Sequence, residues 1–505
     1  MSQPPPPRLY PSSPRDALVS QYVGQPLSSL PTPAAVLDVA AVRRNCGRML
    51  SCVRDLGLQW RAHVKTHKTA EVTRLQVGDD GPARIVVSTL EEAEFLLPLL
   101  REYGARGRPV SVLYGLPLPP GQLPRLAAVG RELGRGSVAV LVDHPAQLER
   151  LEEFARAAGA DFAPHAYLKI DMGGRRAGVQ LESAAFAAVV QAALRAHDAG
   201  AIVLSGLYSH AGHSYAGDSR AAAVAMMAAE IGALLQGADA VVKARAAAAA
   251  AAGGKELQPL VLSAGASPTA LAVQNLLSGE MEQMTSEAGV RGAGGDDDDD
   301  DAPASQELMA AVLQLGALLE DVQDKGHVAE IHAGVYPLLD MQQLAAHSVA
   351  RSALSWRDVA LTVLAEVCSV YPGRGDGGTP EALCGAGGLA LGREFCKAYP
   401  GMAVVSPWGR TDAAGKPMAL PECDVEDYEG WIVGRFAQEH GILTWRGKSG
   451  EGVHLDEFAV GQKIRLWPNH ACITSSHFGW YFVVDSDRVG KEDEVVDIYI
   501  KTRGW

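Results

Sequence analysis

A lysine at position 65 is the residue whose type and surroundings first indicate chemistry. Lys65 lies late in a β-rich run, in the segment RAHVKTHKT, with His63, His67 and Lys68 around it. A lysine in such a place can form a Schiff base with a carbonyl cofactor, because nearby cationic groups lower its pKa and increase the fraction of free amine. A strand-end lysine that only extends its charge to solvent is the alternative explanation.

Two turns rich in glycine and serine are candidates for phosphate binding. The segments are LSAGASPT at 262–269 and EIHAGVYPLLD at 330–340, the latter with Gly334 at its turn and Tyr336 beside it. Small residues at a strand end let backbone N–H groups approach a phosphate closely. Tight turns need glycine in any case, but two such turns on adjacent strands, together with Lys65, predict a phosphate-bearing cofactor.

A third candidate is the segment PNHACITSS, in which His470 and Cys472 are two residues apart. On an extended segment the two side chains share a face, and imidazole with thiolate is a good zinc pair. Two protein ligands leave coordination positions open for water or substrate, which suits a catalytic metal. A buried histidine beside a buried cysteine is the alternative explanation.

The elements that must position these residues form a repeating pattern between residues 58 and 336. Short β-rich runs alternate there with Ala/Leu/Glu/Arg segments of helical character. The eight runs lie at 58–67, 83–89, 111–117, 137–144, 163–172, 202–212, 260–267 and 328–336. This pattern predicts an α/β fold with a TIM-like (β/α)₈ barrel, whose active site lies at the C-terminal strand ends. Polar residues collect at those ends: Lys65, His67, Lys169, Asp171, Tyr208, His210, Ser263, Gly265, His332 and Tyr336.

Beyond about residue 350 the pattern changes to strands without long helices, which predicts a second, mostly β domain. We therefore expect a disordered Pro-rich tail at 1–21, a barrel at 22–350 and a β domain at 351–505. The stretch LSSLPTPAAVLDV either precedes the barrel or supplies a strand to the β domain. Three low-complexity segments are expected to be surface insertions: the alanine run near 244–254, the Gly/Asp stretch at 289–304 and the Gly-rich patch at 373–388.

Composition and charge argue against several classes of protein. With 45 Lys and Arg against 59 Asp and Glu, the net charge of −14 makes nucleic-acid binding through a basic face unexpected. We expect no membrane segment, because no apolar run approaches the roughly 20 residues that a membrane helix needs. Seven scattered cysteines without a CxxC pair predict neither a disulfide framework nor a four-cysteine zinc site. A reducing, cytoplasmic setting is expected, since the start of the chain has no signal-like apolar stretch.

Seven motifs in order resemble the D-serine dehydratase and D-threonine aldolase family: LPTPAAVLD, RAHVKTHKT, YSHAGHSY, SAGASPT, EIHAGVY, QEHG and PNHAC. The likeness runs from about residue 22 to 485, interrupted by the three expected insertions. Members of this family are fold-type III pyridoxal-phosphate (PLP) enzymes, with an alanine racemase-like barrel and a C-terminal β domain. The resemblance implies a homodimer, since such enzymes usually build each site from two chains.

The resemblance also implies roles for individual residues. Lys65 becomes the Schiff-base lysine and the base that takes the α-proton of the substrate. The segment LKIDMGGRRAG at 168–178 is similar to the alanine racemase pattern KxDxGxxRxG and places Arg176 at its arginine, either orienting the site or making a plain salt bridge. Further positions match contacts to the cofactor ring or phosphate: Tyr208, Tyr215, Ser267, Gly334 and Val335.

His470 and Cys472 match the zinc ligands of D-serine dehydratases, whereas typical bacterial D-threonine aldolases have His-x-Asp, a harder pair suited to manganese. The cysteine thus favours zinc over Mn²⁺ or Mg²⁺. The expected activity is that of a D-serine ammonia-lyase that forms pyruvate and ammonia, with D-threonine or D-3-hydroxyaspartate as further substrates. The alternative is a D-threonine aldolase that releases glycine and an aldehyde. Two rivals are a single-barrel PLP carrier, which would lack the β domain, and a racemase, which would need a second base on the opposite face and no metal.

Overall fold

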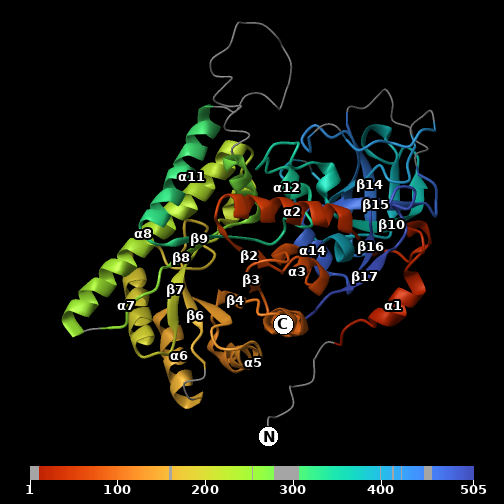
Figure 1. Ribbon diagram of the computed structural model, residues 1–505. Coiled ribbons are helices and arrows are strands. Elements are labelled where there is room, and N and C mark those ends of the chain that lie inside the picture. Colours follow the sequence, from red (N-terminus) through yellow and green to blue (C-terminus); the bar gives the residue numbers. More distant parts are fainter. Residues whose placement is uncertain are drawn as a thin grey trace.

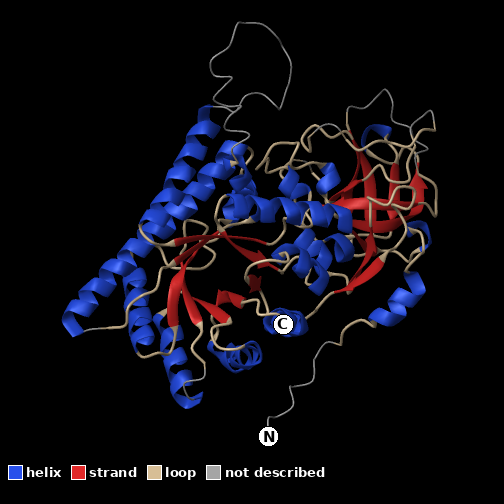
Figure 2. Cartoon of the chain, viewed as in Figure 1, coloured by secondary structure: helices blue, strands red, loops and turns tan. Residues whose placement is uncertain are grey.

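The computed structural model has two parts, a barrel and a large β-sheet, which Figures 1 and 2 show side by side. It describes residues 11–158, 162–252, 254–277, 306–398, 400–411, 415–421, 424–447 and 458–504. The barrel is closed and its eight strands are parallel, as the sequence pattern predicted. These strands are β2 (Gln59–His63), β3 (Ala83–Val87), β4 (Val110–Pro117), β5 (Val138–Val142), β6 (His165–Lys169), β7 (Val203–Tyr208), β8 (Val261–Ala264) and β9 (Val328–Ala333).

Helices connect the barrel strands and cover their outer side (Figure 2). Several begin at a side chain that accepts a hydrogen bond from the first turn, as Thr69, Thr89 and Ser183 do. The helices are α2 (Val39–Asp55), α3 (Ala70–Val77), α4 (Leu90–Ala105), α5 (Leu123–Leu133), α6 (Pro145–Ala158), α7 (Ala184–Asp198), α8 (Arg220–Ala252), α9 (Ser267–Ala272) and α11 (Gln306–Asp324), with the 3₁₀ turns η2 (Pro120–Gln122), η3 (Gly212–Ala216) and η4 (Val273–Leu276).

The second domain is built on a nine-stranded sheet in the order β11-β14-β13-β12-β15-β10-β1-β16-β17. Its strands are β1 (Ala34–Asp38), β10 (Leu361–Tyr371), β11 (Glu381–Cys384), β12 (Ala403–Val405), β13 (Gly430–Phe436), β14 (Gly441–Arg446), β15 (Lys463–Pro468), β16 (Trp480–Val484) and β17 (Asp497–Ile500). The short helical elements are α1 (Arg15–Tyr22), α12 (Met341–Leu344), α13 (Gly388–Leu391), α14 (Ala471–Ser476), η1 (Leu27–Ser29), η5 (Trp356–Asp358) and η6 (Asp376–Gly378). Because β11 also pairs with β10, one side of the sheet curls back on itself.

The structure decides where the N-terminal stretch belongs. Strand β1 lies between β10 and β16 and pairs antiparallel with the first and parallel with the second. The chain therefore starts in the second domain and crosses into the barrel through α2, so the two domains are not consecutive in sequence. Residues 15–21, expected to be part of a disordered tail, lie in helix α1, which packs beside β17 and buries Leu18.

Two of the expected insertions belong to regular structure, and the third lies outside the described residues. The alanine run is the last part of α8, as the high helix propensity of alanine allows. The Gly-rich patch contains strand β11, which pairs with two neighbours. The Gly/Asp stretch at 289–304 falls in the undescribed segment 278–305.

One helix in the described part of the chain is long and apolar enough to cross a membrane by length and composition, which the sequence pattern did not predict. It is Arg220–Ala248 in α8, with a mean hydropathy of 1.5 in its most apolar window. Of that window, 56% is buried inside the protein. The helix packs along α11 and against β7 and β8, so its apolar residues pack against the outside of the barrel (Figure 1).

Candidate active site

Lys65 lies in the turn that follows β2, two residues beyond the end of the strand in which it was predicted. Its side chain is half-buried and lies against the end of β9. A Cβ atom built on Gly334 would lie only 3.3 Å from Lys65 Cε and 3.3 Å from the His63 carbonyl oxygen. The glycine thus leaves the room that the lysine side chain occupies.

The turns after β8 and β9 are joined by a serine. The Ser267 hydroxyl oxygen accepts a hydrogen bond from the Val335 backbone N–H at 3.0 Å, and its side chain also hydrogen-bonds with Tyr215. Gly265 has φ of +148°, and a Cβ there would lie 2.1 Å from the His332 carbonyl oxygen. Only glycine fits this close approach. Three residues predicted as cofactor contacts, Ser267, Val335 and Tyr215, therefore lie together.

Tyr208 and His332 stack face to face inside the barrel, with ring centroids 4.1 Å apart and planes 14° apart. The orientation of His332 follows from a chain of hydrogen bonds. The Ser263 Oγ lies 2.8 Å from Glu330 Oε1 and 3.0 Å from His332 Nδ1, and Glu330 Oε1 also accepts from Arg61 at 2.7 Å. A carboxylate only accepts, so the serine hydroxyl donates to Glu330 and must accept from Nδ1–H.

The other ring nitrogen of His332 is thereby left as an acceptor. Burial lowers the pKa of His332 well below its ordinary value, which keeps the imidazole neutral. Its Nε2 is buried and makes no hydrogen bond to any described residue. A buried lone pair without a partner is costly, so a ligand N–H or O–H group would be stabilised at this position.

Lys169 is the second lysine of the barrel interior. It ends β6, is only 4% exposed, and holds its Nζ 4.9 Å from the centre of the Tyr208 ring. Burial, reinforced by the positive charge of Arg176, lowers the pKa of Lys169 to about 7. A substantial fraction of this lysine is therefore uncharged at neutral pH.

This pKa predicts a pH-dependent stability that Lys169→Met should remove. Between about pH 7 and about pH 10 the unfolded chain keeps the lysine proton while the folded protein has lost it, so stability rises by about 1.4 kcal/mol per pH unit from this group. At neutral pH the methionine variant should therefore have the larger free energy of unfolding, and its difference from the wild type should shrink by that slope as pH rises. Urea unfolding at several pH values measures this difference. The control is Lys325→Met, since Lys325 is a surface lysine whose pKa is raised by Asp239. Parallel curves for wild type and Lys169→Met would contradict the prediction.

A buried carboxylate of α8 holds the segments around this interior in place. Glu230 accepts hydrogen bonds from the Ser209 hydroxyl at 2.9 Å, the Ala211 N–H at 2.9 Å and the Thr269 hydroxyl at 3.0 Å. Burial raises the pKa of Glu230. Sequence reasoning missed this residue, although a lone glutamate in the apolar segment AMMAAEIGALL is the kind of signal that reveals it.

Arg176 lies near the opening of the site and is exposed. Among the residues that the structure describes it makes no ion pair, so the salt-bridge explanation finds no support. Its charge lowers the pKa of Lys169 and, after the larger effect of burial, that of His210. Arg176 therefore contributes positive potential to the site.

His470 and Cys472 meet, but on a different backbone from the one predicted. The extended segment ends at His470, the residue preceding α14, and Cys472 lies in the first turn of that helix. Their side chains hydrogen-bond to each other. Burial would lower the pKa of His470, but Cys472, Asp340 and Glu394 raise it to about 9.

The partner thiol is correspondingly acidic. Burial would raise the pKa of Cys472, but His470 and the charge of Lys65 outweigh that effect, and the pKa falls below its ordinary value. A thiolate beside an imidazole is a soft donor set of the kind that zinc prefers. The His470 Nδ1 is buried and makes no hydrogen bond within the described part of the chain.

Contacts between the two domains bring this pair to the lysine. Thr66 Oγ1 and Cys472 Sγ lie 3.0 Å apart, so the residue next to Lys65 touches the cysteine. The Ser475 hydroxyl of α14 donates to the Thr66 carbonyl oxygen at 2.6 Å. The lysine of the barrel and the cysteine of the second domain therefore belong to one site.

A buried aspartate, which sequence reasoning also missed, fixes the start of α14. Asp340 is fully buried and accepts from the Ala471 N–H at 2.7 Å and the Gln343 N–H at 3.0 Å. Because it closes the motif EIHAGVYPLLD, it lies on the segment that continues from Val335. The segment after β9 thus contributes both to the predicted cofactor contacts and to the position of the predicted metal ligands.

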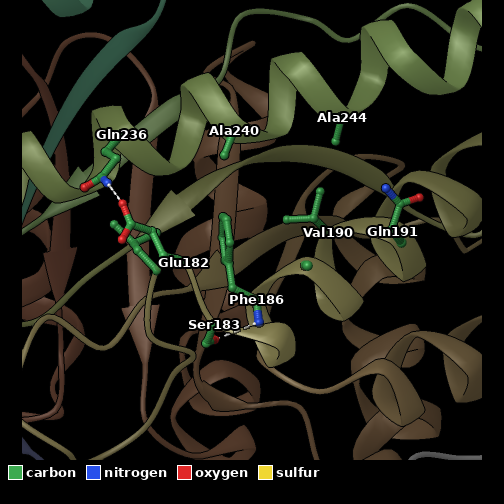
Figure 3. A pocket seen from close by; sticks show the side chains of 10 residues that line it. Glu182, Ser183, Phe186, Val190, Gln191, Gln236, Ala240 and Ala244 are labelled. Atoms are coloured by element: carbon green, nitrogen blue, oxygen red, sulfur yellow. Dashed lines mark hydrogen bonds between the residues drawn. The ribbon is translucent and has the colours of Figure 1, made fainter.

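Two other features do not belong to this site. The apolar groove between α7 and α8, lined by Phe186, Val190, Ala240 and others, contains none of the predicted site residues (Figure 3). The ligand atoms of His347, Asp424 and Glu426 lie within 4.8 Å of one another, but Asp424 is already paired with Arg351.

Both domains match known protein families. Residues 37–282 match the model of the alanine racemase N-terminal domain, and residues 360–484 match the putative serine dehydratase domain. The chain is 34% identical to D-serine dehydratase of Schizosaccharomyces pombe, over 99% of this chain and 98% of that protein. It is 30% identical to D-serine dehydratase of Saccharomyces cerevisiae, over 97% and 99%.

A solved structure gives the same result for the fold. D-threo-3-hydroxyaspartate dehydratase from Delftia sp. HT23 superposes with a TM-score of 0.66 at 27% identity, over 95% of this chain and all of that one. The barrel and the serine dehydratase-type domain are thus present together over the whole length. The chain belongs to the D-serine dehydratase family of fold-type III PLP-dependent lyases.

Proposed function

We propose that this protein is a PLP- and zinc-dependent D-serine dehydratase, which converts D-serine to pyruvate and ammonia. The observation that carries the proposal is the joining of Lys65 to the His470/Cys472 pair through the contact of Thr66 with Cys472. A reaction that must both remove an α-proton and expel a β-hydroxyl group needs a base and a Lewis acid close together.

The residues present fit the cofactor. Lys65 offers an amine beside Gly334, and Gly265 and Ser267 place small residues at a strand end, where a phosphate would be held. The unpartnered Nε2 of His332 offers an acceptor in the same barrel interior. Tyr208, Tyr215, Val335 and Arg176 complete the set.

The residues also fit a metal. His470 and Cys472 supply one nitrogen and one sulfur, and the low pKa of Cys472 favours the thiolate that zinc requires. Solved structures of D-threo-3-hydroxyaspartate dehydratase include a cysteine-to-alanine variant in a metal-free form and a histidine-to-alanine variant. Zinc is favoured over Mn²⁺ or Mg²⁺ because the sulfur ligand is soft.

Within this site the chain's own residues divide the work. The cofactor would supply an electron sink for charge at the α-carbon, and the metal a Lewis acid for the β-hydroxyl. Lys65 Nζ accepts the α-proton. Thr66 and Ser475 hold the helix of Cys472 against the lysine turn, so that base and metal ligand keep a fixed separation.

The products of purified protein with D-serine and with D-threonine test the proposal. We expect pyruvate and ammonia in equal amounts from D-serine, and 2-oxobutyrate from D-threonine if that substrate is also used. L-serine is the control and should not react. The alternative, a D-threonine aldolase, uses the same groups but breaks the Cα–Cβ bond; glycine with an aldehyde and no keto acid would overturn the dehydratase proposal.

A further inference from the structure

A second cavity of the molecule is lined almost entirely by charged and hydroxyl side chains. It lies between α2, which is red in Figure 1, and the segment that leads into β10, and its volume is about 520 Å³. None of its lining residues belongs to the candidate active site. The lining consists of Arg44, Arg48, Arg351, Arg357, Ser352, Ser355 and Asp358.

The lining of the cavity has a net positive charge in a protein that is otherwise acidic. Four arginines against one aspartate give its lining a net charge of +3, whereas the whole chain carries −14. The one aspartate, Asp358, is fully engaged: one carboxylate oxygen accepts from Arg48 at 2.7 Å and the other from the Ser355 N–H and hydroxyl. The negative charge of Asp358 is therefore neutralised within the wall of the cavity.

Two of the other three arginines, Arg44 and Arg357, keep most of their binding capacity. Arg44 lies 3.5 Å from Asp487, whose side chain is 68% exposed, and such solvent-exposed pairs contribute little. The Arg357 guanidinium makes no ion pair with any described residue. Arg351 is paired with Asp424, which lies outside the lining.

The rim is also ordered before any ligand arrives. Arg48 donates to the Ala353 carbonyl oxygen, and Arg44 to that of Arg357 at 3.3 Å. Beneath them the buried Asn45 donates to the carbonyl oxygen of Asp358 at 2.9 Å. Side chains that are already held in place lose little entropy on binding.

We propose that this cavity binds a small phosphorylated anion with two phosphate-type groups, such as diphosphate or a bisphosphorylated sugar. Guanidinium groups match phosphate oxygens in a bidentate arrangement, and serine hydroxyls add donors. A cavity of about 520 Å³ exceeds many times the roughly 30 Å³ of one water, so it has room for an anion larger than orthophosphate. The lining includes no aromatic ring on which a nucleotide base could stack.

Calorimetric titration of the holoenzyme with inorganic pyrophosphate at low ionic strength tests this inference. The holoenzyme is used so that the cofactor already fills the other phosphate site. We expect one site per chain, and a loss of affinity of at least about tenfold for Arg357→Gln and again for Arg44→Gln. Arg54→Gln is the matched control, since it removes the same charge from α2 outside the lining and should bind as the wild type does.

Two further ligands test the assigned chemical class. Citrate, which carries its charge on carboxylates, should bind at least about tenfold more weakly than pyrophosphate. ADP should bind no more tightly than pyrophosphate. Any of four results would overturn the inference. Pyrophosphate would not bind, or it would bind Arg357→Gln as tightly as the wild type. Alternatively, citrate would bind as tightly as pyrophosphate, or ADP would bind tenfold more tightly than pyrophosphate. Melting temperature and D-serine turnover, measured in parallel, show that each variant is folded and keep this result separate from the proposed function.

Discussion

Lys65→Arg is expected to abolish turnover while the protein stays folded. Arginine keeps the positive charge beside Gly334 but cannot bond covalently to a carbonyl carbon or accept the α-proton at neutral pH. We expect activity to fall by about three to four orders of magnitude. The visible absorbance of the lysine-bound cofactor should disappear together with activity, which absorption spectra of the purified variant will show.

The same turn provides a matched control in Lys68→Arg. Lys68 pairs with the buried Glu92 at 2.7 Å, and arginine can keep that ion pair. This variant makes the identical change three residues away and should retain both the cofactor absorbance and most of the turnover. An unchanged spectrum in Lys65→Arg, or its loss in Lys68→Arg alone, would assign the cofactor to another lysine.

Cys472→Ala is expected to lose the metal and the dehydratase activity while it keeps the cofactor. The thiolate is one of two protein ligands in the proposed site, so metal affinity should fall by more than about a hundredfold, the upper range for loss of an outer partner of a metal ligand. Elemental analysis after dialysis measures the metal, and absorption spectra measure the cofactor. Added zinc should restore activity to chelated wild type but not to the variant.

Cys368→Ala serves as the control, because Cys368 is an exposed cysteine of the same domain. Its metal content and activity should equal those of the wild type. Full activity of Cys472→Ala without bound metal would remove the metal from the mechanism. A loss of both metal and cofactor would instead show that Cys472 holds the lysine turn in place through Thr66.

The barrel could be predicted from the sequence because each of its strands is a local signal. A run such as VAVLV in β5, buried at every position, is followed by a helix that starts at a clear boundary. Parallel strands also place all their C-terminal ends on one side, so the polar residues there could be assigned to one site without knowing their contacts. Lys65 was predicted in this way, whereas Ser267 and Val335 were predicted from the family resemblance.

The second sheet could not be ordered from the sequence, because its pairing is non-local. The segment AAVLD contains no signal that the strands with which it pairs lie beyond residue 360. Composition also misled: the alanine run looked like a low-complexity insertion, whereas alanine favours the helix it continues. The segment from His470 to Cys472 was predicted to be extended because HxC spacing fits a strand, yet Asp340 fixes a helix start directly after His470.

Sequence reasoning missed two buried polar residues that hold other segments of the site in place. Glu230 and Asp340 make their contacts with backbone and side chains far away in sequence, and no spacing rule links them to Lys65. Their types were visible in the sequence, but their burial was not. That information exists only once segments far apart in the sequence are packed together.

The position of β1 has a consequence for the synthesis of the chain. This strand leaves the ribosome early, yet its two neighbours are β10 and β16, and β16 begins only at Trp480. At about 5–20 residues per second, the wait for β16 lasts on the order of 20–90 s. Strand β10 is available earlier, but the second domain cannot complete its sheet until β16 has emerged, when nearly the whole chain has been made.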